Sequence, residues 1–309
     1  MERIHSLYLH VPFCTWVCKY CDFNAYAVLE GLIPAYVEAL AREIEKAADD
    51  FPLGPLDTVF IAGGTPSLLT AAQLRRLMDR VRLIGLTPSA EITLEANPSN
   101  VTSEQVAGWL ETLDAVLAAG VQHLSAYELT VESKTRLGQE VRTGLVRMPG
   151  DDEQLAEYWA AAERLQISGY EHYEISNWAT PGFACRHNLA AWHYQPYLGC
   201  GAGAHSMFRI PNGSTERRWN IRGPHAYIRR IGESGQAVDG SEHLSPARAR
   251  GEAAMIGVRL LEGTEAASDF PTKSRQLVAA GLLIEADGRV RLTQRGIELA
   301  NQVGAMFLA

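Results

Sequence analysis

Three cysteines near the start of the chain, Cys14, Cys18 and Cys21, carry the clearest chemical signal in the sequence. Cysteine thiolates hold iron–sulfur clusters, and a four-iron cluster bound by three cysteines keeps one iron open to a small ligand. A zinc site is the alternative, but zinc usually takes four protein ligands at other spacings, and no second Cys/His pair lies close in sequence. The spacing Cys-x3-Cys-x2-Cys therefore predicts a 4Fe–4S cluster on these three residues.

The other two cysteines, Cys185 and Cys200, lie singly and far from the first three. An odd count clustered in this way is typical of a metal site rather than of a disulfide framework. Thiols remain available as ligands in a reducing compartment, so a cytoplasmic setting is expected. The first five residues do not resemble a signal peptide, and no apolar run approaches the length of a membrane span.

The composition is that of an ordinary globular protein, with 47% hydrophobic and 21% charged residues. A chain of 309 residues suffices for one large domain and a smaller one. The net charge of -8 argues against a nucleic-acid partner, because phosphate binding requires a basic face.

Short strands precede the segments that could do chemistry. Ser6–Val11 leads into the cysteines, Thr58–Ala62 stops at Gly63-Gly64-Thr65, and a third strand, Glu91–Glu95, ends on Glu95 itself. Helical spacing of apolar residues separates these strands, which predicts βαβ units and a parallel sheet. Because the carboxyl ends of parallel strands meet at one edge, we expect these segments to converge there.

The helices and the remaining strand follow the same reasoning. The predicted set comprises a helix through Ile33 and Ile44, one capped by Thr70, one carrying Trp109, Leu113 and Val116, and a strand over Val121–Thr130.

The second half changes character. A helix over Asp151–Ser168 leads into a strand over Tyr170–Ile175, and a stretch rich in glycine and aromatic residues follows over 181–208. From Pro246 onward we expect helices over Ala253–Leu261 and Lys273–Ala280, a hairpin turning at Asp287-Gly288, and a last helix from Gln294. This order is winged-helix-like. From Pro246 to Ala309 there are eight Lys or Arg residues and seven Asp or Glu residues, so no basic face is evident. This balance favours a structural or partner-docking module over a DNA-binding one.

Tyr8-Leu9-His10-Val11-Pro12-Phe13-Cys14 and Cys21-Asp22-Phe23-Asn24 resemble the cluster loop of the radical S-adenosylmethionine (SAM) superfamily. The match is to the branch that holds oxygen-independent coproporphyrinogen III oxidases and HemW-type haem chaperones. The resemblance implies an α/β fold: a radical-SAM partial (βα) barrel over 1–178, then a smaller α+β domain over 179–309 whose winged-helix-like part covers about 246–309.

The resemblance also implies a SAM site beside the cluster. Its residues would be Tyr8, Phe23, Gly63-Gly64-Thr65 and Glu95, with the glycines permitting close approach of the backbone. An electron donor would reduce the cluster, and SAM would be cleaved to a 5′-deoxyadenosyl radical. Taken alone, the Gly-Gly-Thr segment could be a simple turn between strand and helix.

Two features favour the chaperone branch. The oxidases carry a fourth cysteine where this chain has Phe23. The chaperones carry an H-N-x-x-Y-W motif linked to haem, and here His187 to Trp192 matches it with Ala191 in place of tyrosine. His187 would be a haem ligand, since imidazole is a good axial ligand; the alternative is a histidine satisfied by hydrogen bonds. Cys185 is a second ligand or, more simply, a buried thiol.

The resemblance therefore implies a haem-binding chaperone that passes haem to an unidentified acceptor protein. The alternative is an enzyme of porphyrin biosynthesis, a radical SAM coproporphyrinogen III oxidase. A third hypothesis is a chain that folds poorly and does neither.

The barrel is expected to be shortened. After Glu95-Ala96-Asn97-Pro98 the family continues with two further βα units, whereas this chain passes directly to a segment resembling the helix before the last barrel strand. At about 30 residues per unit, roughly 60 residues are absent, with the junction between Val101 and Gly108. The loss would remove polar residues that the family brings to SAM.

Overall fold

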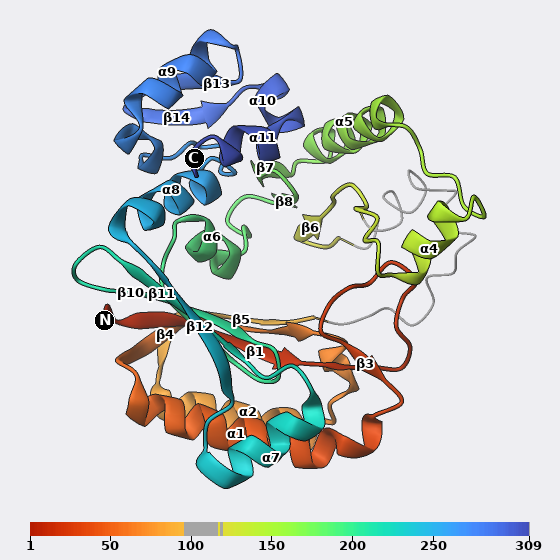
Figure 1. Cartoon of the computed structure of the whole chain (residues 1–309), viewed down its shortest axis with the longest axis vertical. Coiled ribbons are helices and arrows are strands. Elements are labelled where there is room, and N and C mark those ends of the chain that lie inside the picture. The colour runs from red at the N-terminus through yellow and green to blue at the C-terminus, as the bar shows by residue number, and fades with distance from the viewer. Residues whose placement is uncertain (96–116, 118–119, 309) are drawn as a thin grey trace. The chain divides into compact units, whose positions relative to one another are not determined.

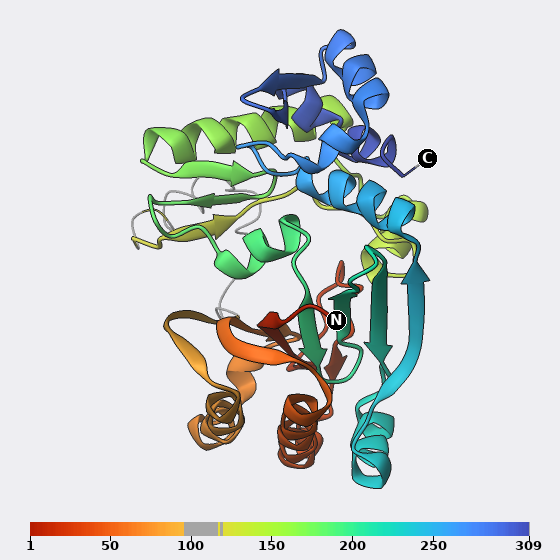
Figure 2. The ribbon, with the colours of Figure 1, turned by 90° about the vertical axis from the view of Figure 1, so that its left-hand side faces the viewer.

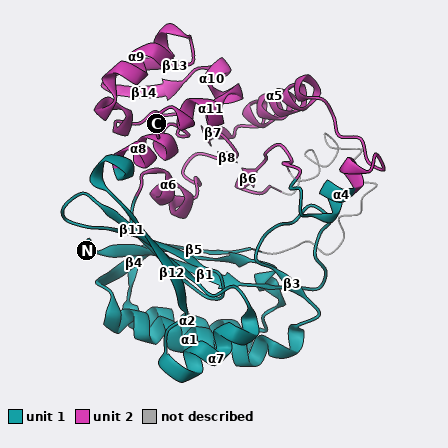
Figure 3. Ribbon diagram, in the orientation of Figure 1, with its two compact units in different colours: residues 1–97, 132–139, 195–249 teal, residues 98–131, 140–194, 250–309 magenta. Residues whose placement is uncertain are grey.

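The computed structural model describes residues 1–95, 117 and 120–308. By its contacts the chain forms two compact units, each assembled from segments far apart in the sequence (Figure 3). Unit 1 comprises Met1–Asn97, Glu132–Gln139 and Gln195–Ala249, and unit 2 comprises Pro98–Val131, Glu140–Tyr194 and Arg250–Ala309. The domain boundary expected between residues 178 and 179 falls inside unit 2 and stays a prediction.

Unit 1 is built around a seven-stranded sheet in the order β12-β11-β10-β9-β1-β4-β5. Its strands are β1 (Ile4–Val11), β4 (Leu53–Gly63), β5 (Leu86–Leu94), β9 (Tyr197–Cys200), β10 (His205–Arg209), β11 (Thr215–Asn220) and β12 (Val238–Leu244). Strands β9, β1, β4 and β5 run parallel, and β10, β11 and β12 extend the sheet with antiparallel pairing. In β1, Leu7 lies between Leu198 of β9 and Val59 of β4. The four parallel strands therefore present their carboxyl ends at one edge of the sheet.

Three helices lie side by side on one face of this sheet (Figures 1 and 2). They are α1 (Ile33–Asp50), α2 (Ala71–Ile84) and α7 (Pro224–Ser234). The predicted apolar stripe of α1, from Ile33 to Ile44, is buried in the core of unit 1. The predicted cap of α2 is also confirmed, because Thr70 and Gln73 form a capping box.

Four short elements connect the strands and helices of unit 1. They are β2 (Phe13–Cys14), β3 (Tyr26–Ala27), and the 3-10 helices η1 (Glu30–Leu32) and η2 (Pro66–Leu68).

Unit 2 contains a three-stranded antiparallel sheet in the order β6-β8-β7. Its elements up to residue 192 are β6 (His123–Ser125), α5 (Asp151–Ile167), β7 (Glu171–Glu174), β8 (Asn177–Ala179) and α6 (Arg186–Trp192). Leu165 of α5 packs with Tyr170 and Trp178 in a small core, as its helical spacing predicts.

A second core of unit 2 gathers the C-terminal elements. These are η4 (Ala266–Asp269), α9 (Pro271–Ala279), β13 (Leu283–Ala286), β14 (Arg289–Leu292), α10 (Gln294–Glu298) and α11 (Ala300–Ala305). The predicted hairpin is confirmed: β13 pairs antiparallel with β14, and both Asp287 and Gly288 have positive φ angles of 52° and 75°, as a type I′ turn requires. Helices α4 (Arg136–Arg142) and α8 (Pro246–Gly257) each have residues in both units.

The strand predicted over Val121–Thr130 is wrong in length and in partner. Only His123–Ser125 is a strand, and it pairs antiparallel with β8 in unit 2 instead of joining the parallel sheet. The physical reason is burial: Tyr127 is 68% exposed and Leu129 is 39% exposed, so the segment has no buried apolar face to hold a longer strand.

The helix predicted over Ala253–Leu261 begins earlier and ends earlier. Helix α8 starts at Pro246, because proline suits the first turn of a helix, and the Ser245 hydroxyl accepts from the Arg248 N–H. It ends at Gly257, and Leu260 forms an isolated bridge with Glu174.

Two expectations lie outside the described residues: the helix carrying Trp109, Leu113 and Val116, and the junction between Val101 and Gly108. In the described part of the chain, no helix is both long and apolar enough to cross a membrane.

Candidate metal centre

The three cysteines lie on the loop that follows β1. Strand β2, which ends at Cys14, pairs with β3 and closes this loop at its base. Cys18 and Cys21 lie in a turn in which the Cys21 N–H donates to the Cys18 carbonyl (3.1 Å). All three thiols are half-buried and none is in a disulfide bond. We name residues Cys14–Asn24 the cluster loop.

The cluster loop packs against the Gly63-Gly64-Thr65 turn that follows β4. The Gly64 N–H donates to the Val11 carbonyl (2.8 Å), and the Thr65 N–H donates to the Phe13 carbonyl (2.7 Å). The Thr65 hydroxyl contacts the Cys14 sulfur at 3.5 Å. A Cβ atom on Gly64 would lie 3.0 Å from that sulfur and 2.6 Å from the Phe13 carbonyl oxygen. The glycine is therefore required by the close approach of the two segments.

Glu95 joins the same edge of the sheet. Its backbone N–H donates to the Ile61 carbonyl (3.0 Å), and its carboxylate accepts a hydrogen bond from the Gly63 N–H. Burial raises the pKa of the Glu95 carboxyl, and the Gly63 N–H opposes that rise. The structure thus brings together the ends of β1, β4 and β5, as the sequence predicted.

Tyr8 and His10 point into this edge from β1. The Tyr8 hydroxyl lies 2.8 Å from His10 Nδ1, and His10 Nε2 lies 3.0 Å from the Asn24 carbonyl oxygen. Because a carbonyl can only accept, Nε2 carries the proton and Nδ1 accepts from Tyr8. Burial lowers the pKa of His10, so the neutral ring is favoured, and burial together with the Glu95 charge raises the pKa of Tyr8.

Phe23 differs from these residues. Its side chain is 67% exposed, as are large parts of Trp16 and Tyr20 on the same loop. The structure therefore places Phe23 on the cluster loop but outside the buried group formed by Tyr8, Gly63 and Glu95.

The donor set fits an iron–sulfur cluster. Three half-buried thiols project from one loop whose base is fixed, and burial and the neighbouring thiols raise the pKa of Cys21, a cost that bound iron cations would reverse. Among the described residues no three His, Cys, Asp or Glu side chains converge on a single ion. A 4Fe–4S cluster needs no such convergence, because each thiolate binds a different iron.

The candidate haem residue, His187, belongs to unit 2. It lies half-buried in the first turn of α6, and its neighbour Asn188 donates from its side chain to Tyr173. The Tyr173 hydroxyl lies 2.7 Å from His123 Nε2. Cys185, the N-cap of α6, is buried, which supports its interpretation as a buried thiol.

Trp192, at the end of α6, makes a cation–π contact with Arg259, which is itself paired with Glu174. The Arg259 guanidinium lies 4.6 Å from the centre of the Trp192 ring and 3.1 Å from the Glu174 carboxylate, which is fully buried. In the part of the chain that the structure describes, Trp192 Nε1 is buried without a hydrogen-bond partner. A cavity of about 270 Å³ opens beside Trp192 and His193, and His187 is not in its lining.

The sequence did not predict the roles of Tyr36 and Asn24, which fix the cluster loop and the strand before it. Tyr36 on α1 donates to the His10 carbonyl (2.8 Å), and Asn24 donates to the Ala202 carbonyl (2.8 Å). The Gly-Ala-Gly run at 201–203 is visible in the sequence as a tight turn. Nothing in the sequence indicates that this turn contacts the loop that carries the cysteines.

Comparison with known proteins agrees with this geometry. A model of the radical SAM superfamily matches residues 8–175. The solved structure of coproporphyrinogen III oxidase (HemN) from Escherichia coli, a radical SAM enzyme, matches with a TM-score of 0.76 at 18% identity, covering 99% of this chain and 90% of that one. At this identity the likeness shows the fold. The predicted fold class, an α/β fold of the radical SAM type, is confirmed.

Two relatives identify the family within this superfamily. The chain is 32% identical over 368 residues to the heme chaperone HemW of Mycobacterium tuberculosis (strain ATCC 25618 / H37Rv), covering 96% of this chain and 93% of that one. It is 28% identical over 375 residues to the heme chaperone HemW of Escherichia coli (strain K12), covering 98% of both. The chain therefore belongs to the radical SAM superfamily and, within it, to the HemW family.

Both alignments are longer than the 309 residues of this chain, so each passes over positions that this chain lacks. This agrees with the expected loss of roughly two βα units.

Proposed function

We propose that this protein is a haem chaperone of the HemW type that carries a 4Fe–4S cluster on Cys14, Cys18 and Cys21 and binds haem through His187. The haem would be passed to an acceptor protein in the cytoplasm. The observation that carries the proposal is the 32% identity, over 96% of the chain, to a protein named heme chaperone HemW. The half-buried thiols on one loop and the His187 motif on α6 support it.

The residues at the edge of the sheet are those we assign to SAM. A bound cluster would supply electrons for reductive cleavage of SAM, given an electron donor. Gly63, Gly64 and Thr65 would meet the SAM amino group with their backbone atoms, since glycine permits close approach, and Glu95 offers a second carboxylate oxygen beyond its bond to Gly63. Tyr8 and Phe23 would flank the ligand.

The competing function is that of a coproporphyrinogen III oxidase. The likeness to the oxidase structure is a likeness of fold at 18% identity, and Phe23 occupies the position where the oxidases carry a fourth cysteine. Anaerobic incubation with coproporphyrinogen III, SAM and a reductant separates the two functions: decarboxylated product would favour the oxidase.

Haem titration tests the chaperone proposal. We expect a Soret band to develop with one haem per chain in the parent, and His187→Ala to weaken binding at least tenfold. His193→Ala is the matched control, since His193 is the next histidine along, at the C-cap of α6, and its contact with Glu262 at 3.7 Å is weak. Equal haem affinity in the parent and in His187→Ala would remove His187 from the site.

Electron paramagnetic resonance of the reduced, reconstituted protein tests the SAM assignment. A change in the cluster signal on adding SAM would support the assigned residues. A four-iron signal that does not change when SAM is added would show that the shortened barrel carries the cluster but has no SAM site.

A further inference from the structure

The turn Gly201–Gly203, which follows β9, contacts the end of β1 that leads into the cluster loop and Asn24, the last residue of that loop. On β1, N-terminal to the cluster loop, a Cβ on Gly201 would lie 2.5 Å from the His10 carbonyl oxygen. At the C-terminal end, the Asn24 side chain donates to the Ala202 carbonyl (2.8 Å) and to the Arg222 carbonyl (3.1 Å). Gly201 has a φ of 112°, so both its conformation and its surroundings exclude a side chain. We name residues 201–203 the glycine turn.

Tyr36 strengthens the contact at the N-terminal end. Its hydroxyl donates to the His10 carbonyl and accepts from the Ala202 N–H, both at 2.8 Å. The side chain is fully buried and its ring packs edge-on against Phe13, the residue before Cys14. A single hydroxyl therefore ties the glycine turn to the strand that leads into the cysteines.

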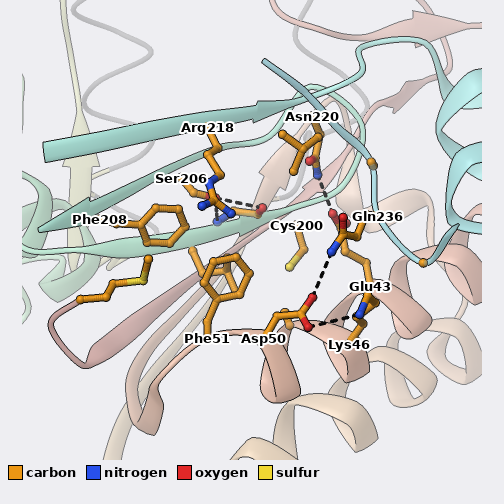
Figure 4. Close-up of a pocket in the computed structure, with 17 residues that line it drawn as sticks. Glu43, Lys46, Asp50, Phe51, Cys200, Ser206, Phe208, Arg218, Asn220 and Gln236 are labelled. Carbon is orange, nitrogen blue, oxygen red and sulfur yellow. Dashed lines mark hydrogen bonds and ion pairs between the residues drawn. The ribbon is translucent and has the colours of Figure 1, made fainter. Parts of the chain in front are cut away.

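Glu43 holds the glycine turn from the opposite side. Its Oε2 accepts from the Gly201 N–H and from the Tyr227 hydroxyl, each at 2.7 Å, and its Oε1 accepts from the Asn220 side chain at 2.6 Å. Asn220 also donates to the Gly201 carbonyl (3.0 Å), so both polar groups of Gly201 are fixed. Figure 4 shows Glu43 on α1 reaching across to Asn220 on β11, with Cys200 beside them.

The surroundings of Glu43 define its charge state. The titratable groups that face it are the Tyr36 and Tyr227 hydroxyls and the Cys200 thiol, all neutral at physiological pH because burial raises their pKa values. Two cationic side chains, Lys46 and Arg218, line the same cavity together with Met1, and they pair with Asp50 at 3.2 Å and Glu216 at 2.6 Å. Among the described residues, no cation contributes to the pKa of Glu43, and the three hydrogen bonds are what oppose its burial.

Water has a route to this carboxyl. A cavity of about 320 Å³ lies beside this carboxyl and is lined by Glu43, Cys200 and Asn220 together with Phe51 and Phe208 (Figure 4). Opening of the glycine turn would expose the carboxyl to this solvent without unfolding the sheet.

We propose that Glu43 is a positioning residue for the metal centre: it holds the glycine turn, and the glycine turn holds the strand that leads into the cluster loop and the last residue of that loop. Retention of the cluster then depends on a carboxylate that touches neither iron nor SAM. The effect of Glu43 on cluster retention rests on the proposed function. The hydrogen bonds from Glu43 to the glycine turn are expected in the iron-free chain as well.

The direction of the pH effect follows from linkage. Burial raises the pKa of Glu43 to about 7 in the closed state, against an ordinary value of 4.5. The closed state therefore keeps a proton that an opened state releases, and opening becomes easier as the pH rises from about 4.5 to about 7. A difference of about 2.5 pKa units corresponds to an increase of up to a few hundredfold in opening.

Hydrogen exchange of the iron-free chain tests the hold on the turn. We expect the amides of Gly201 and Ala202, corrected for intrinsic rates, to open at least tenfold more often at pH 7.5 than at pH 5 in the parent. In Glu43→Gln this dependence should vanish. Glu45→Gln is the control, because Glu45 lies on the same helix and pairs at the surface with Arg80. A purely structural role would raise exchange in Glu43→Gln and leave its pH dependence unchanged, and that result would overturn the proposal.

Iron release tests the consequence for the cluster. After anaerobic reconstitution, a ferrous chelator at pH 7.5 should remove iron at least fivefold faster from Glu43→Ala, which leaves the Gly201 N–H without its acceptor, than from the parent and from Glu45→Ala. Equal rates would refute the link between Glu43 and the cluster loop. If the parent takes up no iron, the proposed function fails, and the exchange comparison still decides the role of Glu43. If the Glu43 variants do not fold, Tyr227→Phe, which removes one of the three donors, replaces them. It should release iron faster than the parent, and the pH dependence of its exchange should move to higher pH, because the Tyr227 hydrogen bond lowers the pKa of Glu43.

Discussion

Replacing Gly64 by alanine should displace the cluster loop. The new Cβ would lie 2.6 Å from the Phe13 carbonyl oxygen and 3.0 Å from the Cys14 sulfur. Cβ atoms do not approach backbone this closely, and Phe13 cannot give way, because its side chain is fully buried and its carbonyl accepts from the Thr65 N–H. Either β2 or the turn that follows β4 has to move.

The cost can be bounded from these contacts. Overpacking a well-packed site by one methyl group costs about 1–3 kcal/mol, and loss of the Thr65 to Phe13 hydrogen bond would add about 1 kcal/mol. For domains of 150–250 residues each kcal/mol lowers the Tm by about 2–4 °C. We therefore expect the Tm of Gly64→Ala to fall by several degrees, and its iron content after reconstitution to fall below half that of the parent because Cys14 is displaced.

Differential scanning calorimetry of the iron-free chain and an iron assay after reconstitution check both numbers. Gly31→Ala is the matched control: Gly31 lies between the cluster loop and α1, and a Cβ there would meet no atom within 4 Å. Wild-type Tm and iron content in Gly64→Ala would refute the reasoning, since they would show that the turn and β2 separate at no cost.

Two further predictions concern unit 2. Arg259→Ala removes the counter-ion of the fully buried Glu174, so the free energy of unfolding in urea should fall by about 3–5 kcal/mol, and an unchanged midpoint would contradict the ion pair. His172 stacks on Trp178 at 4.2 Å and burial lowers its pKa, so the unfolded chain takes up the proton first. The stability it contributes is present above pH 6.5 and is lost as the pH falls below that value; His172→Phe, which keeps the stacking, should reduce this loss between pH 7.5 and pH 5.

Much of the fold was predictable because it depends on short-range patterns. The apolar stripe of α1, the capping box of α2 at Thr70 and the turn at Asp287-Gly288 each arise from residues within a few positions of one another. The length of β6 was not predictable in this way, because Val121–Thr130 has the composition of a strand and only burial decides whether it pairs.

The candidate metal centre also has a part that short-range patterns predict and a part that depends on tertiary contacts. The three cysteines and the segments that end β1, β4 and β5 could be assigned from the sequence, because parallel strands bring their carboxyl ends to one edge. The roles of Tyr36, Asn24 and Glu43 could not, because each acts on a turn that lies more than 150 residues away along the chain.

The sequence by itself determined the chemistry that the loop can offer, since ligand type and spacing are local properties of Cys14, Cys18 and Cys21. Only the tertiary structure decided how that loop is held. Strand β9 pairs with β1, which places the glycine turn against His10 and Asn24 and buries Glu43 behind it. The physical reason is that a hydrogen bond between distant segments depends on the register of the sheet and on the packing of α1, and neither can be read from the residues that make the bond.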